Sequence, residues 1–255
     1  MPNRSRPLPL IFLWLASSLL LSCGGSQVLA PQYVAEQPNA LAVDSLLQPD
    51  AATLAYIQPY KLQIDSLMNQ VIGQAARELP KGEIESPLGN FVADLIEESV
   101  RASSSAGVDM GVITTGGVRI PLPKGPLTRG DIFELMPFEN MLQVLELSGE
   151  QTLRLFEHAA RVKNLAISNS QLLVRGGQIE RITIGGKPFD PAKTYRIATS
   201  DYLAGGGDHL GMLKEARVLE YTDILLRDAI VAKIQALQAQ GLAVDARVEG
   251  RVIIE

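Results

Sequence analysis

The sequence predicts an α/β (α+β) domain in which helices flank a mixed β-sheet. Segments with helical and strand-like spacing of apolar residues interleave along the chain, which is typical of sheets covered by helices. Neighbouring strand-like segments are joined by short turns, such as Gly176-Gly177, so we expect antiparallel hairpins as well as parallel pairs. With 46% hydrophobic residues in 255, the chain has enough apolar material for one substantial core or two small ones.

Periodicity and capping residues indicate the order of the elements. Thr128 with Asp131, and Ser148 with Gln151, are typical of helix starts, and we expect Thr222 to cap the last helix. Apolar stripes predict helices around 64–72, 88–100, 128–136, 153–160 and 226–237. Strands are predicted at 108–114, 142–147, 172–174, 179–184, 195–199 and 251–254.

The segment around Pro59 is harder to assign. A proline should kink or end any helix that begins near Asp50. Residues 71–79 can either prolong the helix that follows this proline or form a strand. Gly73 and Pro80 favour the strand.

Charge and residue counts exclude several classes of function. The net charge is −5, from 23 basic and 28 acidic residues, whereas nucleic-acid binders carry a basic excess, so no nucleic-acid polymer is expected as a partner. One cysteine allows no disulfide within the chain, and two histidines, His158 and His209, cannot build a His-rich dinuclear metal centre. We therefore expect no metal and no cofactor bound by this chain itself. The sequence has no Gly-x-Ser-x-Gly motif, which argues against a serine hydrolase of that type.

Residues 1–22 are expected to form a signal peptide. Two arginines precede an almost wholly apolar run of about 14 residues, which is too short for a comfortable membrane span. The run ends at Leu20-Leu21-Ser22-Cys23, and this pattern resembles the lipobox of bacterial lipoproteins. The resemblance implies cleavage before Cys23 and attachment of lipid to its sulfur. An ordinary signal peptide followed by a chance cysteine is the alternative.

A lipidated Cys23 would anchor the rest of the chain to a membrane surface. Gly24 follows it where an Asp would favour retention at the inner membrane, so we expect the outer membrane, facing the periplasm or the cell surface. Residues 23–48 lack periodicity, and we expect a flexible tether there. Residues 49–255 would then form the folded domain.

Glycine-rich loops after two predicted strands suggest a ligand site. Gly116-Gly117 lets the backbone approach a ligand closely, and Arg119 supplies a permanent bidentate donor for phosphate or ribose oxygens. Asp208 follows three glycines, so that its carboxylate could accept from a ligand hydroxyl. Two alternatives remain open: Arg119 could pair with a surface carboxylate, and Asp208 could satisfy turn amides.

Phe138 and Tyr202 lie in loops beside proline or glycine, which argues against a place in a core stripe. Two such rings can sandwich a nucleobase by stacking. The alternative is that they plug the ends of the sheet.

Four segments carry a family resemblance when they are taken together. They are Glu85-Ser86-Pro87-Leu88-Gly89-Asn90, Thr115-Gly116-Gly117-Val118-Arg119, Met136-Pro137-Phe138-Glu139-Asn140 and Ser200-Asp201-Tyr202-Leu203-Ala204-Gly205-Gly206-Gly207-Asp208. In order and spacing they resemble the C-terminal, substrate-binding domain of the bacterial 5'-nucleotidase/UDP-sugar hydrolase family, over roughly residues 50–255. The resemblance implies that Phe138 and Tyr202 clamp the base and Asp208 holds the ribose. It also implies that Asn140 supports the base pocket and Arg119 binds ribose or phosphate.

Four positions depart from the family pattern. Pro87 stands where many members have an arginine, and proline cannot donate a hydrogen bond. Thr114 stands at the family's Asn position and Thr115 replaces its first Gly, whereas Gly116 and Gly117 are retained. Thr114 is still expected to bind substrate by a hydrogen bond, although it reaches less far than Asn. Tyr202 replaces the usual Phe and keeps the stacking face. We therefore expect base stacking to be retained and phosphate binding to be weakened.

The largest difference from the two-domain members of the family concerns the residues that carry out catalysis. Their N-terminal metallophosphatase domain binds two metal ions with Asp-x-His, Gly-Asn-His-Glu and Gly-His-x-His motifs, which this sequence lacks. Three interpretations remain open. The chain could be the substrate-binding half of a split 5'-nucleotidase, with the divalent metal pair in a separate metallophosphatase chain. It could also be a non-catalytic lipoprotein that binds a nucleoside or nucleotide, or a protein-interaction module. No catalytic residue is expected in this chain, and whether it counts as an enzyme stays open.

Overall fold

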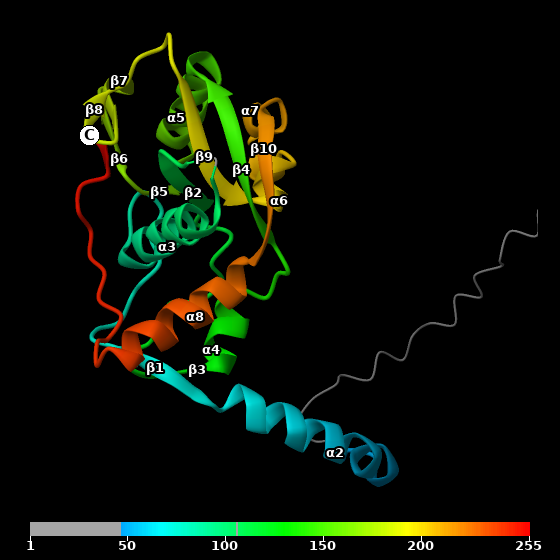
Figure 1. The fold of residues 1–255 in the computed structure, drawn as a ribbon. Helices are drawn as coiled ribbons and strands as arrows, with labels where there is room; N and C mark the ends of the chain where they lie inside the picture. The colour runs from blue at the N-terminus through cyan, green and yellow to red at the C-terminus, as the bar shows by residue number, and fades with distance from the viewer. Residues whose placement is uncertain (1–46, 106) are drawn as a thin grey trace, which may run out of the picture. The chain divides into compact units, whose positions relative to one another are not determined.

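The central element is a five-stranded sheet with the strand order β10-β4-β9-β2-β5 (Figure 1). The computed structural model describes residues 47–105 and 107–255, and Ala51–Glu255 form one compact unit. The strands are β2 (Met110–Thr114), β4 (Met141–Ser148), β5 (Leu165–Ile167), β9 (Thr194–Ser200) and β10 (Arg217–Leu225). Strands β2 and β9 are parallel and the other neighbouring pairs are antiparallel, so the sheet is mixed, as predicted.

Two smaller sheets complete the strand content of the described residues. Strands β6 (Ser170–Arg175) and β7 (Gln178–Ile184) form the hairpin predicted at Gly176-Gly177, and both turn glycines have positive φ angles. β8 (Lys187–Pro188) pairs with β7, and β11 (Val252–Ile254) runs parallel to β6.

The second small sheet settles the assignment of residues 71–79. β1 (Val71–Ala75) pairs in antiparallel fashion with β3 (Gly125–Thr128), so this stretch begins as a strand. Ile72 and Ala75 are buried, which makes this short pair part of the core.

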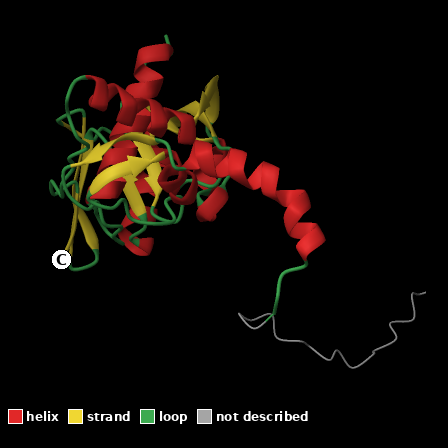
Figure 2. Cartoon of the chain, turned by 90° about the horizontal axis from the view of Figure 1, so that it is seen from below, coloured by secondary structure: helices red, strands yellow, loops and turns green. Residues whose placement is uncertain are grey.

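Four helices pack around these strands (Figure 2), namely α3 (Pro87–Ser103), α4 (Arg129–Leu135), α5 (Gly149–Val162) and α8 (Leu226–Ala239). Helix α2 (Ala51–Met68) precedes β1 and has no buried residue. Three short turns of helix follow β9: α6 (Asp201–Ala204), the 3-10 helix η1 (Gly207–His209) and α7 (Gly211–Lys214).

The central sheet separates two apolar clusters, because successive strand residues point to opposite faces. Ile113, Val144 and Ala198 pack into the cluster that contains the buried residues of α3, α4 and α8. Their neighbours face the other cluster, with α5 and the β6–β7 hairpin; these neighbours are Val112, Leu145 and Ile197. Burial on both faces fixes the strand register.

Two of the three predicted helix starts are confirmed. Thr128 with Asp131 caps α4, and Ser148 with Gln151 caps α5, each as a complete capping box. The prediction for Thr222 is wrong. This residue lies in β10, where its hydroxyl donates to the carbonyl of Leu142 at 2.7 Å, and α8 begins without a side-chain cap.

Of the two outcomes expected at Pro59, a kink or an end of the helix, the end does not occur, because α2 continues through this residue. A proline inside a helix removes one backbone hydrogen bond and frees a carbonyl. No residue of α2 is buried, so we infer that water can solvate the freed carbonyl.

The expected signal peptide, Cys23 and the predicted tether up to residue 46 lie outside the described residues. Within residues 47–105 and 107–255, no helix combines the length and the apolar character that a membrane crossing requires.

Candidate functional site

A pocket of about 280 Å³ lies at one edge of the central sheet. Its lining consists of Gly116, Gly117, Arg119, Phe138, Asn140, Tyr202 and Asp208. Because β2 and β9 are parallel, the loops that follow them leave the sheet at the same edge. β4 runs antiparallel to β9, so the loop that precedes β4 reaches this edge too. The topology thus brings together three loops that are far apart in sequence.

The Gly116-Gly117 turn lies beside the carboxylate of Asp208. A side chain at position 116 would begin 3.6 Å from the Oδ2 atom of Asp208, in ordinary van der Waals contact. The amide of Gly117 donates to the carbonyl of Thr114 at 3.0 Å and closes the turn directly after β2. Thr114 itself does not line the pocket, but it contacts Asp208 from behind.

Arg119 supplies the only cationic side chain of the pocket lining. Its guanidinium carbon lies 6.0 Å from the ring centroid of Phe138, and its Nη1 donates weakly to the carbonyl of Gly116 at 3.4 Å. Among the described residues no carboxylate forms an ion pair with Arg119, in contrast to the alternative of a surface ion pair. Most of its donors are therefore available to an anionic or hydroxylated ligand.

The two loop aromatics are exposed and belong to neither apolar cluster. Phe138 is 38% and Tyr202 53% exposed. Side chains this exposed do not plug the ends of the sheet. In the described part of the chain the two rings do not stack on one another, so both remain available to a ligand in the pocket between them.

Asp208 is held by hydroxyl groups rather than by turn amides. Thr114 Oγ1 donates to Oδ2 at 2.5 Å, and the Tyr202 hydroxyl donates to Oδ1 at 2.9 Å. Asp208 and His209 have φ angles of 51° and 64°, a left-handed backbone that is costly for residues other than glycine. The Asp208 side chain lines the pocket.

The ring of Tyr202 lies directly on the backbone of Gly207. A side chain at position 207 would begin 2.5 Å from the ring atoms Cε1 and Cζ, so only glycine fits there. From the sequence, Tyr202 was expected to offer only a stacking face. The hydrogen bond from its hydroxyl to Asp208 could not be predicted, because it depends on the fold of the glycine loop.

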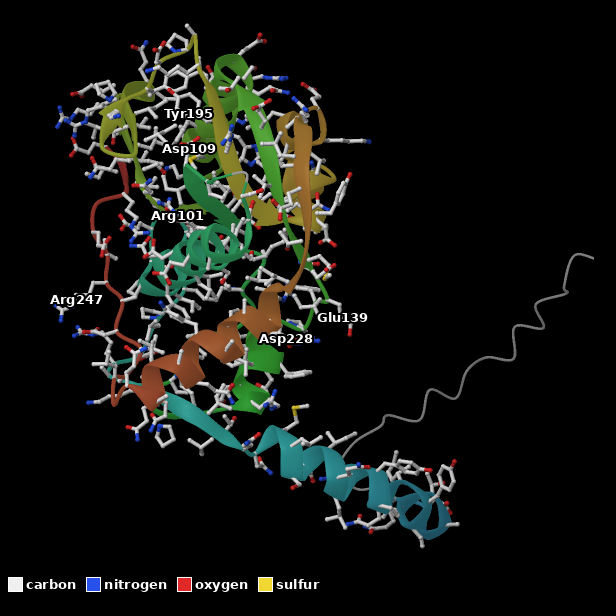
Figure 3. All side chains as sticks on the ribbon, in the orientation of Figure 1. Arg101, Asp109, Glu139, Tyr195, Asp228 and Arg247 are labelled. Carbon is white, nitrogen blue, oxygen red and sulfur yellow. The ribbon has the colours of Figure 1, made fainter. Side chains whose placement is uncertain are left out.

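Helix α8 fixes the loop before β4. The amide of Leu226 donates to the carbonyl of Asn140 at 2.9 Å. Arg227 lies with its guanidinium carbon 4.2 Å from the ring centroid of Phe133 and its Nη2 3.7 Å from Glu139. Figure 3 shows Glu139 beside the start of α8, where Asp228 is labelled. Arg227 was not among the site residues predicted from the sequence, because its burial becomes visible only in the folded chain.

Pro87 is not brought to the pocket. It is the first residue of α3, where a proline is favoured, and the hydroxyl of Ser86 caps this helix by accepting from the amide of Gly89. Glu85 accepts from the amides of Glu249 and Arg251. In this structure the segment 85–90 therefore builds the fold and does not line the pocket.

His158 is a buried residue of α5 and only 2% exposed. Burial lowers the pKa of His158, and the positive charge of Arg161 lowers this pKa further. His209 also lowers the pKa of His158, whereas the negative charge of Asp208 raises it. Within the described ranges, no group of three or more His, Cys, Asp or Glu side chains is placed to hold a metal ion.

Known proteins share both the sequence and the fold of this chain. Residues 71–215 match the family described as "5'-nucleotidase, C-terminal domain". Protein UshA of Yersinia enterocolitica is 30% identical over 207 residues, which are 79% of this chain and 35% of UshA. An apyrase of Tabanus yao is 29% identical over 154 residues, or 50% of this chain and 28% of the apyrase.

Among solved structures, the 5'-nucleotidase precursor of Thermus thermophilus superimposes with a TM-score of 0.68 at 29% identity, over 80% of this chain and 42% of that one. The chain thus spans about a third of the length of the two curated relatives above. Because the family match covers more than half of the chain, and the mixed α/β fold agrees with it, this chain belongs to the family of 5'-nucleotidase C-terminal domains.

Proposed function

We propose that this chain is the nucleotide-recognition part of a split 5'-nucleotidase. In this proposal the pocket binds the nucleoside portion of a nucleotide, and a separate metallophosphatase chain supplies the divalent metal pair that hydrolyses the phosphate ester. The observation that carries the proposal is the pocket itself. It combines two exposed aromatic rings, a carboxylate and a cation in one cavity.

The base end of the pocket is formed by Phe138 and Tyr202. Every nucleobase offers a flat face, and stacking on an aromatic side chain contributes about 1–3 kcal/mol per base. A backbone hydrogen bond from Leu226 to Asn140 attaches the loop that carries Phe138 to α8, so this loop is held in place before a ligand binds. Such a clamp suits recognition by stacking more than by hydrogen bonds to one particular base.

The sugar and phosphate end is formed by Asp208 and Arg119. A carboxylate accepts from ribose hydroxyls, and a guanidinium donates to ribose or phosphate oxygens. Arg119 is the single cation of the lining. We therefore expect nucleosides to bind almost as well as their monophosphates.

In this proposal a partner chain hydrolyses the phosphate ester, because no metal-binding residues for this reaction are found in this sequence. The metallophosphatase motifs of the family are absent from the sequence, and the residues that the structure describes offer no cluster for a metal ion. The purified chain with added Mn²⁺ or Zn²⁺ should release no phosphate from AMP. Turnover that disappears in His158→Gln or His209→Asn would contradict this assignment.

Anchoring through Cys23 is the second part of the proposal. A lipid on Cys23 would hold the chain at the cell envelope, with the outer membrane as the expected site. The full-length protein should then partition into detergent, and Cys23→Ala should accumulate as an uncleaved precursor. Normal cleavage of the variant, with release of soluble protein, would indicate an ordinary signal peptide.

Calorimetric titration with adenosine, guanosine, uridine and AMP tests the recognition function. Phe138→Ala and Tyr202→Ala should each weaken nucleoside binding by roughly 5- to 150-fold, because each removes one stacking face. Tyr221→Ala removes an exposed ring outside the pocket and serves as the control. If both pocket variants bind like the wild type while remaining folded, the aromatic clamp is wrong and an interaction module becomes the better interpretation.

A further inference from the structure

The carboxylate of Asp208 already accepts one hydroxyl on each of its oxygens before any ligand is bound. Thr114, buried at the end of β2, donates to Oδ2, and Tyr202, on the short helix α6, donates to Oδ1. The two donors belong to segments that are far apart in sequence, since Thr114 ends β2 and Tyr202 lies in α6. They fix the plane of the carboxylate, which would otherwise rotate about its terminal torsion.

This arrangement leaves acceptor capacity on both oxygens. An ionised carboxylate has about four lone-pair sites, and the two hydroxyls use one site on each oxygen. One site per oxygen therefore remains for a ligand. Two neighbouring hydroxyls, such as the 2' and 3' hydroxyls of a ribose, match a carboxylate held in a fixed plane.

The same hydrogen bond also orients the aromatic ring. The Tyr202 ring rests on Gly207, where no side chain fits, and its hydroxyl is tied to Asp208. A phenylalanine at position 202 would keep the contact with Gly207 but would lose the hydrogen bond to Asp208. The stacking face and the sugar carboxylate are thus joined through one phenolic hydroxyl.

We propose that Tyr202 is a positioning residue whose hydroxyl couples the base-stacking ring to the Asp208 carboxylate and thereby favours ribonucleosides over 2'-deoxyribonucleosides. The inference rests on the proposed function, because it assumes that a nucleoside occupies this pocket. It adds a role that stacking alone does not require. It also gives a reason for a tyrosine at a position where a phenylalanine would stack equally well.

The test compares adenosine, 2'-deoxyadenosine and adenine in titrations of the wild type and Tyr202→Phe. The variant should bind adenosine roughly 3- to 10-fold more weakly, which is less than the loss of a charged hydrogen bond made to the ligand itself. Its preference for adenosine over 2'-deoxyadenosine should shrink by a similar factor, while adenine binding stays within about twofold. Tyr56→Phe, on the exposed helix α2, is the matched control and should change none of the three affinities.

Thr114 provides a second variant from the other side of the carboxylate. Thr114→Val removes the hydroxyl at nearly constant volume and should reduce the same preference, whereas Thr114→Ser keeps a donor and should restore it. Circular dichroism confirms that each variant is folded.

Each outcome has a distinct meaning. Equal or tighter adenosine binding by Tyr202→Phe would overturn the coupling while leaving nucleoside recognition intact. A wild-type protein that binds neither adenosine nor adenine would overturn the proposed function and this inference with it.

Discussion

At the scale of single residues, glycine at position 207 decides where the Tyr202 ring can lie. Gly207→Ala places a methyl group within 2.5 Å of two ring atoms, so the ring must move away. The φ angle of Gly207 is open to alanine, but the methyl group would also lie 2.7 Å from the backbone oxygen of Tyr202, so the loop must shift together with the ring. We expect nucleoside affinity to fall by roughly 5- to 150-fold, as for loss of one stacking face.

The matched control for this prediction is Gly211→Ala. A methyl group at position 211 has no heavy atom within 4 Å, and the backbone there is also compatible with alanine. Titration of both variants with adenosine separates the ring contact from a general effect of losing a glycine. Normal binding by Gly207→Ala would mean that the ring position is unimportant.

His158 should make the stability of the fold depend on pH. Burial, and then the charge of Arg161, lowers its pKa in the folded chain. Between that lowered pKa and the unfolded value of about 6.5, the unfolded chain binds more protons. The free energy of unfolding should therefore rise as the pH rises through this window, by at most about 1.4 kcal/mol per pH unit. Above pH 7 this contribution is constant.

Urea unfolding of the wild type and His158→Gln between pH 5 and 8 measures this dependence. The variant should show a flatter profile over the acidic part of the range. His209→Asn, at an exposed position, is the control and should retain most of the wild-type slope. An identical slope in His158→Gln and the wild type would assign the pH dependence to other groups.

Several residues of the site could be predicted from the sequence, because charged side chains and glycines in loops are typical of ligand sites. Gly116-Gly117, Arg119 and Asp208 stand beside breakers, where side chains are free of core packing. The bond between Tyr202 and Asp208, and the position of Arg227, could not be predicted. Both depend on backbone angles and contacts that form only in the tertiary structure.

At the scale of elements, the inner strands of the central sheet were predictable and its edge strand β10 was not. Strands β2, β4 and β9 lie inside this sheet, and apolar residues in each of them indicated a strand. β10 lies at an edge, pairs with register shifts and has mostly half-buried side chains, so no alternating pattern marks it. Thr222 therefore suggested a helix cap, although its hydroxyl bonds across to β4.

Helix α2 offers a test of which elements hold the fold together. None of its residues is buried, whereas β1, which follows it, buries Ile72 and Ala75. A chain that begins at Asn69 should therefore unfold within a few degrees of the wild type, because little apolar burial is lost. A chain that begins at Ala76 should be far less stable or fail to fold.

Thermal unfolding followed by circular dichroism compares the two shortened chains. A large loss of stability on removing α2 alone would show that this helix packs against the fold in solution. Equal stability of the two chains would show that the β1–β3 pair contributes nothing to the core.

At the scale of the whole molecule, the topology of the central sheet explains where the pocket lies. The parallel pair β2–β9 and the antiparallel strand β4 bring three loops to one edge, and all seven lining residues come from these loops. The fold class could be predicted from interleaved helices and strands, whereas the division into three sheets could not, because strand pairing depends on contacts distant in sequence.

The central claim is that a nucleoside binds in this pocket between Phe138 and Tyr202, with its sugar on Asp208. A crystal structure of the protein with adenosine tests it most directly. We predict the base between the two rings, and the ribose hydroxyls within hydrogen-bond distance of both Asp208 oxygens while Tyr202 and Thr114 keep their bonds to the same carboxylate. Adenosine bound at another site, or a base that touches neither ring, would contradict the account.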